Sequence, residues 1–248
     1  MTNNPSVLRL AAVFVVWALV STTALAGTQP GGLLPDSHLN PGVFPINSRP
    51  YGLSYGDWST KWWRWAYAIP FSTNPIYDLT GGDCALNQSG PVWFLAGTAG
   101  TPVTRTCTIP AGKAILFPIL NVLADYPCPD PGFHPGPGQT LAQFLTETAR
   151  DYINATTELD AQVDATPLKH LFVYRTTSRM FSFIGDTSMT VFDPCITGTR
   201  QPGVSDGYWI MLTPLSPGPH TIHFHGIEQF PSGDFELDVN YDFTVTPR

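Results

Sequence analysis

The sequence predicts a mainly β protein: an antiparallel β-sandwich, Ig-like or jelly-roll-like, with two inserted helices. Short apolar or β-branched segments recur along the chain with turn signals every 8–15 residues, and Gly and Pro together account for 47 of the 248 residues. Many short strands separated by such turns are typical of a sandwich. Helical periodicity appears near residues 54–69 and 140–153.

The amino-terminal 26 residues are typical of a secretory signal peptide. Arg9 precedes an apolar run over residues 10–20, and Ala24-Leu25-Ala26 offers small residues for cleavage after Ala26. The run is about half of the roughly 20 residues that a membrane-spanning helix needs. An uncleaved anchor is the alternative. Residues 27–50, rich in Gly, Pro, Asn and Ser, then predict an extended arm before a single domain over 51–248.

Charge and composition limit the partners of the processed chain. Removing residues 1–26 takes away Arg9 and no acid, so 222 residues remain with 11 basic and 19 acidic side chains, a net charge of −8. Such a surface repels phosphates, and the sequence has no Lys/Arg cluster, so we expect neither nucleic acid nor anionic lipid as a partner. No later stretch is apolar enough to span a membrane, which favours a secreted, periplasmic or cell-surface protein.

The first helix is predicted from a cap and an aromatic stripe. Ser54 and Asp57 have the spacing of a capping box, and Pro70 ends the helix. Large apolar residues recur between them at spacings of 3, 4, 3 and 4, which places them on one face. They are Tyr55, Trp58, Trp62, Trp65 and Ile69.

Strands are expected on both sides of a second helix. That helix is predicted over 140–153, with Thr140 and Gln143 as its capping box. Pro118 lies in the predicted strand 114–120 and suggests a bulge there or a position at the edge of the sheet. The last strand alternates cleanly, with apolar residues from Phe235 to Val245 on one face and polar residues on the other. The predicted strands are 92–96, 103–109, 114–120, 158–163, 170–175, 181–184, 188–192, 208–212, 220–225 and 235–245.

Four cysteines follow the predicted signal peptide: Cys84, Cys107, Cys128 and Cys195. An even number in an oxidising compartment indicates two disulfides, with three possible connectivities. We favour Cys84–Cys107, which closes a short loop around one strand, and Cys128–Cys195, which ties the Pro/Gly-rich loop at 127–138 to the Asp193-Pro194-Cys195 turn. The alternatives are four free thiols or one bridge, and the spacings match no zinc pattern.

A His-x-His pair near the end of the chain is the candidate metal site. His223 and His225 alternate with Ile222 and Phe224, so both imidazoles face the same side of a strand. The closing strand is expected to return beside it, with Glu236, Asp238 and Asp242 on its polar face. Two His and one carboxylate would suit iron, zinc or manganese, and His-x-His also suits copper. Alternatively, the two histidines belong to the solvated face of a sandwich and bind no metal. His220 alternates with them along the strand, so it faces the other side and would not join the pair.

The aromatic helix offers a second candidate site, for ligand binding. Trp63 and Tyr67 lie off the main apolar stripe of this helix. If these two rings are exposed, they could stack on a sugar or anchor a partner protein. Core packing is the alternative for the whole cluster. Templates for serine hydrolases, zinc proteases and P-loops are absent from the sequence, so no catalytic residue is predicted.

Several segments of the mature chain are informative when taken together. They are Tyr55–Ser59 with Trp62-Trp63 and Pro70, Asp83-Cys84, Val92–Gly97, Cys107–Lys113 with Phe117-Pro118, Leu215–Gly218 and His220–Phe224. Together they resemble a group of uncharacterised secreted bacterial proteins. The resemblance implies export, a Cys84–Cys107 pairing and a β fold, and it implies no activity. The final segment also looks like the end of bacterial Ig-like modules, which is a fold analogy alone.

Three functions are compatible with these features. The leading hypothesis is a non-enzymatic exported binding or surface module, with carbohydrate or an extracellular protein as its ligand. The alternative is a metal-dependent extracytoplasmic enzyme that uses His223, His225 and a carboxylate. The third is an envelope or appendage component, whose arm would bind a neighbouring subunit through Leu33, Leu34, Val43 and Phe44.

Overall fold

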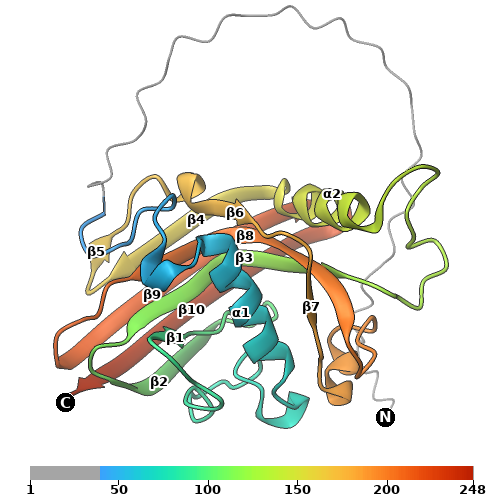
Figure 1. Cartoon of the computed structure of the whole chain (residues 1–248). Helices are drawn as coiled ribbons and strands as arrows, with labels where there is room; N and C mark the ends of the chain where they lie inside the picture. Colours follow the sequence, from blue (N-terminus) through green and yellow to red (C-terminus); the bar gives the residue numbers. More distant parts are fainter. Residues whose placement is uncertain (1–39, 248) are drawn as a thin grey trace, which may run out of the picture. The chain divides into compact units, whose positions relative to one another are not determined.

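The computed structural model describes residues 40–247. The predicted signal peptide and its cleavage after Ala26 lie outside this range, as do Leu33 and Leu34 of the predicted arm. The described part is mainly β, with two five-stranded sheets and two α-helices (Figure 1), as the sequence predicts.

Sheet A has the strand order β1-β3-β8-β6, and β7 also pairs with β8. Sheet B has the order β2-β10-β9-β4-β5. The pairs β1–β3 and β2–β10 are parallel and the other pairs are antiparallel. The bounds in sheet A are β1 Val92–Phe94, β3 Ala114–Asp125, β6 Arg175–Thr177, β7 Phe181–Phe183 and β8 Gln201–Leu212. Those in sheet B are β2 Val103–Pro110, β4 Thr156–Val163, β5 Thr166–Pro167, β9 Gly218–Phe230 and β10 Gly233–Thr246.

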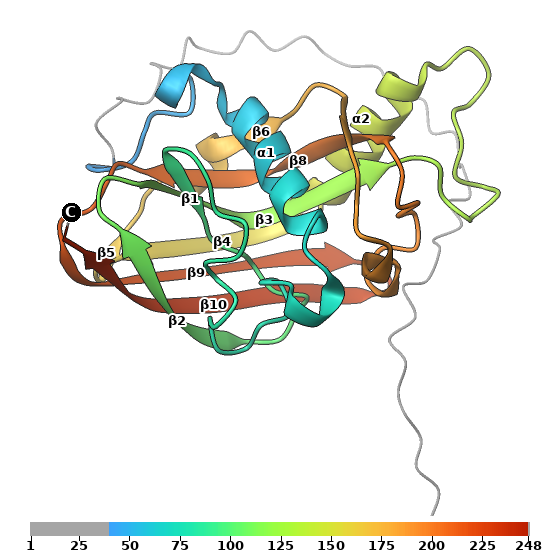
Figure 2. The same cartoon turned by 60° about the horizontal axis from the view of Figure 1, so that its bottom comes forward.

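The two sheets pack against each other through one face of each. Phe117 of β3 stacks on Phe224 of β9, with ring centroids 5.0 Å apart, and both side chains are fully buried. The other face of sheet A is also covered, because helix α1 lies over it (Figure 2). Trp209 of β8 packs there against Trp62 of α1, with ring centroids 5.6 Å apart. Sheet A is therefore apolar on both faces, whereas sheet B has one buried face and one solvated face.

Helix α1, Tyr55–Tyr67, forms where the sequence predicts it. Ser54 accepts a hydrogen bond from the backbone of Asp57, and the Asp57 carboxylate accepts one from the Ser54 backbone, which completes the capping box. Every member of the predicted stripe is at most 6% exposed. The indole N–H of Trp62 donates a hydrogen bond of 2.9 Å to the Leu95 carbonyl, which fixes the helix to the segment just after β1.

Helix α2, Leu141–Ile153, is capped by Thr140 and Gln143 as predicted. Its buried residues are Leu145, Ala149 and Ile153, which recur every four residues and face β3 and β8. The helical pattern of the sequence also predicts Tyr152 on the inner face, but that side chain is 38% exposed and packs at the edge against Phe230 of β9.

Two predicted strands are wrong. Residues Leu171–Tyr174 form a 3-10 helix, which begins after His170 in a left-handed conformation with φ 55°. One helical turn brings Leu171 and Tyr174 into the core together, and strand β6 starts only at Arg175. Residues Thr187–Val191 also form a 3-10 helix, capped by the Asp186 side chain.

Strands β3 and β8 are longer than predicted. Strand β3 continues to Asp125, and its register shifts between Pro118 and Leu120, so Pro118 marks a bulge inside the sheet. Strand β8 begins at Gln201, seven residues before the predicted start at 208. Gly207 fits there because it lies against the β3 backbone, where a Cβ atom would approach the Leu120 carbonyl to 2.5 Å.

Part of the predicted arm belongs to the packed domain. Val43 forms an isolated β-bridge with Leu212, and Phe44 donates its backbone N–H to the Met211 carbonyl at 2.9 Å. The side-chain amide of Asn40 donates a hydrogen bond to the Lys169 carbonyl and accepts one from the Lys169 backbone N–H. The domain therefore includes residues 40–50, and Val43 and Phe44 pack against its own strands rather than projecting from it.

Both favoured disulfides are present. Cys84–Cys107 attaches the loop before β1 to strand β2, and Cys128–Cys195 joins the loop after β3 to the segment before β8. Their sequence separations are 23 and 67 residues. Two disulfides fit a protein that folds in an oxidising compartment.

Candidate functional site

The solvated face of sheet B gathers most of the polar side chains singled out in the sequence. Residues of β9 and β10 alternate between the core and this face, as the sequence predicts. The register places Asp238 of β10 opposite His225 and Asn240 opposite His223. Strand β4 flanks β9 on the other side and presents Asp160 opposite His225.

His223 lies between two carboxylates from neighbouring strands. Its Nε2 is 2.9 Å from Oδ1 of Asp238 on β10, and its Nδ1 is 3.6 Å from Oδ1 of Asp160 on β4. The imidazole side chain is 30% exposed. Both contacts are diagonal in the register, so the ring leans along the sheet rather than toward the residue directly opposite.

His225 repeats this arrangement one step along the strand. Its Nε2 is 3.0 Å from Oε1 of Glu236, and its Nδ1 is 3.9 Å from Oε1 of Glu158. Each imidazole therefore has its own carboxylate on β10 and its own carboxylate on β4. This alternation forms a ribbon of acidic and imidazole groups across three strands.

This pairing bears on the predicted metal set of His223, His225, Glu236 and Asp238. A single ion needs ligand atoms that converge, whereas the two rings here point to different carboxylates. Within residues 40–247, one group of three His, Cys, Asp or Glu residues has ligand atoms that all lie within 4.8 Å of one another. The three residues are Asp125, Asp193 and Cys195. That sulfur belongs to a disulfide, so the trio offers no thiolate.

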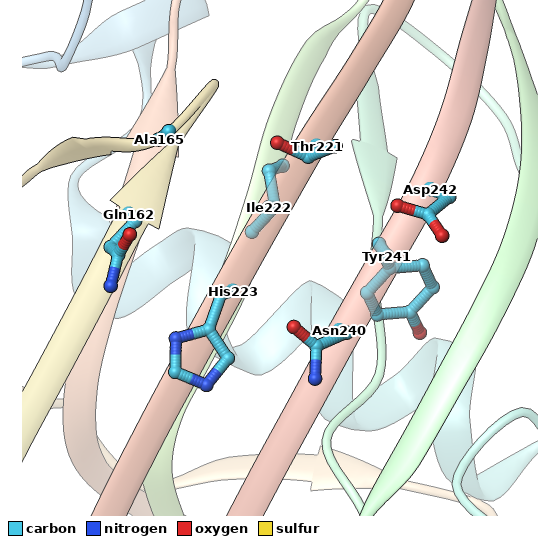
Figure 3. Close-up of a pocket in the computed structure, with 8 residues that line it drawn as sticks. All are labelled: Gln162, Ala165, Thr221, Ile222, His223, Asn240, Tyr241 and Asp242. Atoms are coloured by element: carbon cyan, nitrogen blue, oxygen red, sulfur yellow. The ribbon is translucent and has the colours of Figure 1, made fainter.

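A polar trough lies beside His223 on the same face, and Figure 3 shows its lining. The hollow has a volume of about 420 Å³. Polar groups from three strands border it: the amides of Gln162 and Asn240, the hydroxyl of Thr221 and the carboxylate of Asp242. A second hollow of about 320 Å³ shares Thr221 and Asp242 with it, so the two are continuous along β9 and β10.

The β4–β5 hairpin forms one wall of the trough. Its turn residues Asp164 and Ala165 are left-handed, with φ 49° and 60°, as a two-residue hairpin turn requires. The Asp164 carboxylate accepts from the Thr221 backbone at 2.9 Å and contacts Nδ1 of His220 at 2.7 Å. These contacts hold the hairpin against the start of β9.

His220 is part of this anchor rather than of the imidazole ribbon. Burial lowers its pKa, but hydrogen bonds to the Asp164 carboxylate and the Ser216 carbonyl outweigh that effect, so the pKa of His220 is raised. Both ring nitrogens face acceptors, which favours the doubly protonated ring.

The trough lies on an acidic surface. Within the five strands of sheet B, Arg105 is the one Lys or Arg, and it is 1% exposed and faces the core. The solvated face therefore presents carboxylates, amides, hydroxyls and imidazoles without a permanent positive charge. Such a face disfavours anionic ligands.

Trp63 and Tyr67, the candidate binding residues on the aromatic helix, are buried, so the alternative of core packing holds for them. Trp63 is 4% and Tyr67 2% exposed, because both rings pack against strands β7 and β8 of sheet A. Tyr67 packs against Phe183 of β7, with ring centroids 5.7 Å apart, and Trp63 donates its indole N–H to the Ser205 hydroxyl at 3.0 Å. Neither ring is available to stack on a ligand.

Three carboxyl groups with a raised pKa were not predicted. Burial raises the pKa of Glu228 to about 7, and burial together with the neighbouring charge of Asp193 raises the pKa of Asp125 to about 8. Burial also raises the pKa of Asp193. The sequence carries no signal for them, since each lies in a segment with alternating or turn-rich character like many exposed acids.

Comparisons of the chain with family models, with curated proteins and with solved structures find no match. In the part of the chain that the structure describes, no helix is long and apolar enough to cross a membrane.

Proposed function

We propose that this chain is an exported binding protein, built as a β-sandwich of Ig-like or jelly-roll type, which binds a neutral carbohydrate in the trough on sheet B. The observation that carries the proposal is the set of polar side chains that converge there from β4, β9 and β10. Export is supported by the amino-terminal pattern and by two disulfides.

A neutral polyhydroxylated ligand fits this chemistry. The amides of Gln162 and Asn240 both donate and accept, and the carboxylate of Asp242 accepts from hydroxyl groups. The acidic surroundings oppose sulfated, phosphorylated or uronic sugars. The trough is shallow and its ring, Tyr241, is 1% exposed, so binding would depend on hydrogen bonds rather than on stacking.

The alternative, a metal-dependent enzyme, has less geometric support. A metal ion shared by His223 and His225 would have to displace their contacts with Asp238 and Glu236 and draw the two rings together. Metal analysis by mass spectrometry on wild-type protein and on the His223→Ala/His225→Ala variant distinguishes the two functions. Stoichiometric metal that is lost in the variant would favour the enzyme.

The carbohydrate proposal is tested by glycan-array screening of the mature protein, followed by calorimetric titration with the neutral oligosaccharides that bind. Asn240→Ala and Gln162→Ala should each weaken binding about tenfold, the effect of losing one good hydrogen bond. Thr108→Ala is the matched control, because Thr108 is exposed on the same sheet but lies outside the trough. No neutral glycan bound, or equal affinity in all three variants, would refute the proposal.

A further inference from the structure

The two disulfides have different surroundings. Cys84 and Cys107 are 7% and 5% exposed and belong to the core. Cys128 and Cys195 are half-buried, and Cys128 lies in the Pro/Gly-rich loop after β3. An external thiol can therefore approach the second disulfide more readily than the first.

Polar groups are organised around Cys195. The Asp193 carboxylate accepts from the Cys195 backbone N–H at 3.0 Å, and the Gln201 amide donates to the Cys195 carbonyl at 3.0 Å. The same amide nitrogen of Gln201 donates to the Asp125 carboxyl. Carboxyl oxygens of Asp125 and Asp193 and the sulfur of Cys195 all lie within 4.8 Å of one another.

Asp125 is placed to carry a proton at this position. Its side chain is at the end of β3 and is 3% exposed. Burial, followed by the charge of Asp193, raises its pKa to about 8. The other titratable group in contact is Tyr67, whose hydroxyl donates to the Asp193 carboxylate at 3.1 Å. At neutral pH the pair therefore retains a proton next to the disulfide.

We propose that Cys128–Cys195 is a thiol-exchange site, in which the Asp125 carboxyl is the proton donor to the sulfur of Cys195. The partner would be a dithiol, either a small molecule or a protein with two neighbouring cysteines. This inference does not depend on the carbohydrate proposal, because the disulfide lies in segments that contribute nothing to the trough.

The exchange proceeds in two steps. One thiolate of the dithiol attacks the Cys128 sulfur, the Cys128–Cys195 bond breaks, and the departing Cys195 thiolate takes the proton of Asp125. The second sulfur of the dithiol, as a thiolate, then attacks the first sulfur of the dithiol, which is bonded to Cys128. The Cys128 thiolate leaves and takes a proton from water. Two electrons pass from the dithiol to the protein, which ends with two thiols, and Asp125 is left as a carboxylate.

Reduction of the folded, mature protein by dithiothreitol tests the proposal. Samples are alkylated at intervals, and mass spectrometry of peptides follows each disulfide separately between pH 6 and pH 9. Rates are divided by the concentration of dithiothreitol thiolate. We expect Cys128–Cys195 to react at least about tenfold faster than Cys84–Cys107, and its corrected rate to fall as Asp125 loses its proton.

Asp125→Asn should slow reduction of Cys128–Cys195 at pH 7 about tenfold or more and remove the fall at high pH. Asp130→Asn, an exposed position in the same loop, is the control and should behave like wild type. Unchanged rates in Asp125→Asn would overturn the proposal. If that variant does not fold, the wild-type profile decides, since a corrected rate independent of pH also overturns it.

Discussion

The guanidinium of Arg105 donates a hydrogen bond of 2.8 Å to the hydroxyl of Tyr241, its direct neighbour across the β2–β10 pair. Both side chains are 1% exposed. The same guanidinium donates to backbone carbonyls in two loops that no strand pairing fixes. These acceptors are Ile76, Asp78, Ala96 and Gly97.

Replacing Arg105 should strongly destabilise the fold. Arg105→Met removes the guanidinium donor from four backbone carbonyls, of which, within residues 40–247, only that of Ala96 keeps another donor, the Tyr241 hydroxyl, and we expect the free energy of unfolding to fall by about 3 kcal/mol or more. Arg105→Lys keeps the charge but reaches fewer acceptors, so it should recover only part of the loss. Urea unfolding of both variants measures this, and a loss in Arg105→Met below about 0.5 kcal/mol would contradict it.

The packing of helix α1 on sheet A depends on Trp62. Trp62→Ala removes a large buried ring and the bond to the Leu95 carbonyl, and should cost about 3–5 kcal/mol of stability. Lys61→Ala on the exposed side of the same helix is the control and should stay within about 0.5 kcal/mol of wild type. Equal thermal midpoints for the two variants would show that the helix contributes little to the core.

Glu228 should make stability depend on pH. Burial raises its pKa from 4.5 to about 7, so the folded chain holds a proton that the unfolded chain releases near pH 4.5. Its contribution is greatest below pH 4.5 and is lost as the pH rises through about 7. One side-chain oxygen of Glu228 has no hydrogen-bond partner, so the ionised form is poorly compensated.

Glu228→Gln should therefore be more stable than wild type at pH 8, by up to about 3 kcal/mol, and nearly equal to it at pH 4. Urea unfolding at the two pH values provides the measurement. The exposed Glu147→Gln on α2 serves as the control and should show the wild-type dependence. A constant difference between Glu228→Gln and wild type at both pH values would exclude this role for Glu228.

The two disulfides should contribute unequally to stability. Loop-closure entropy predicts a loss of about 3 kcal/mol for Cys84→Ser/Cys107→Ser and about 4 kcal/mol for Cys128→Ser/Cys195→Ser, because the second bridge closes the longer loop. Denaturant unfolding of each double variant under non-reducing conditions checks the order. The reverse order would mean that contacts around Cys84–Cys107 outweigh the effect of loop length.

The sequence determined those features that depend on neighbours along the chain. Capping residues such as Ser54 and Asp57 act within one turn, and the stripe from Tyr55 to Ile69 repeats with the helix. The alternation in β10 reflects one buried and one solvated face, and the pattern therefore also placed His223 and His225 on a common surface. The favoured disulfide pairing follows from loop lengths and turns.

The tertiary structure decided what depends on partners distant in sequence. Leu171 and Tyr174 form a helical turn because the core accepts both, although their segment is β-branched and aromatic like a strand. Trp63 is buried where its indole meets Ser205 of β8, and the raised pKa of Asp125 comes from burial in the fold and from the charge of Asp193, which is distant in sequence. The free energy of such contacts comes from burial and from pairing across the fold, which a local pattern of residues does not contain.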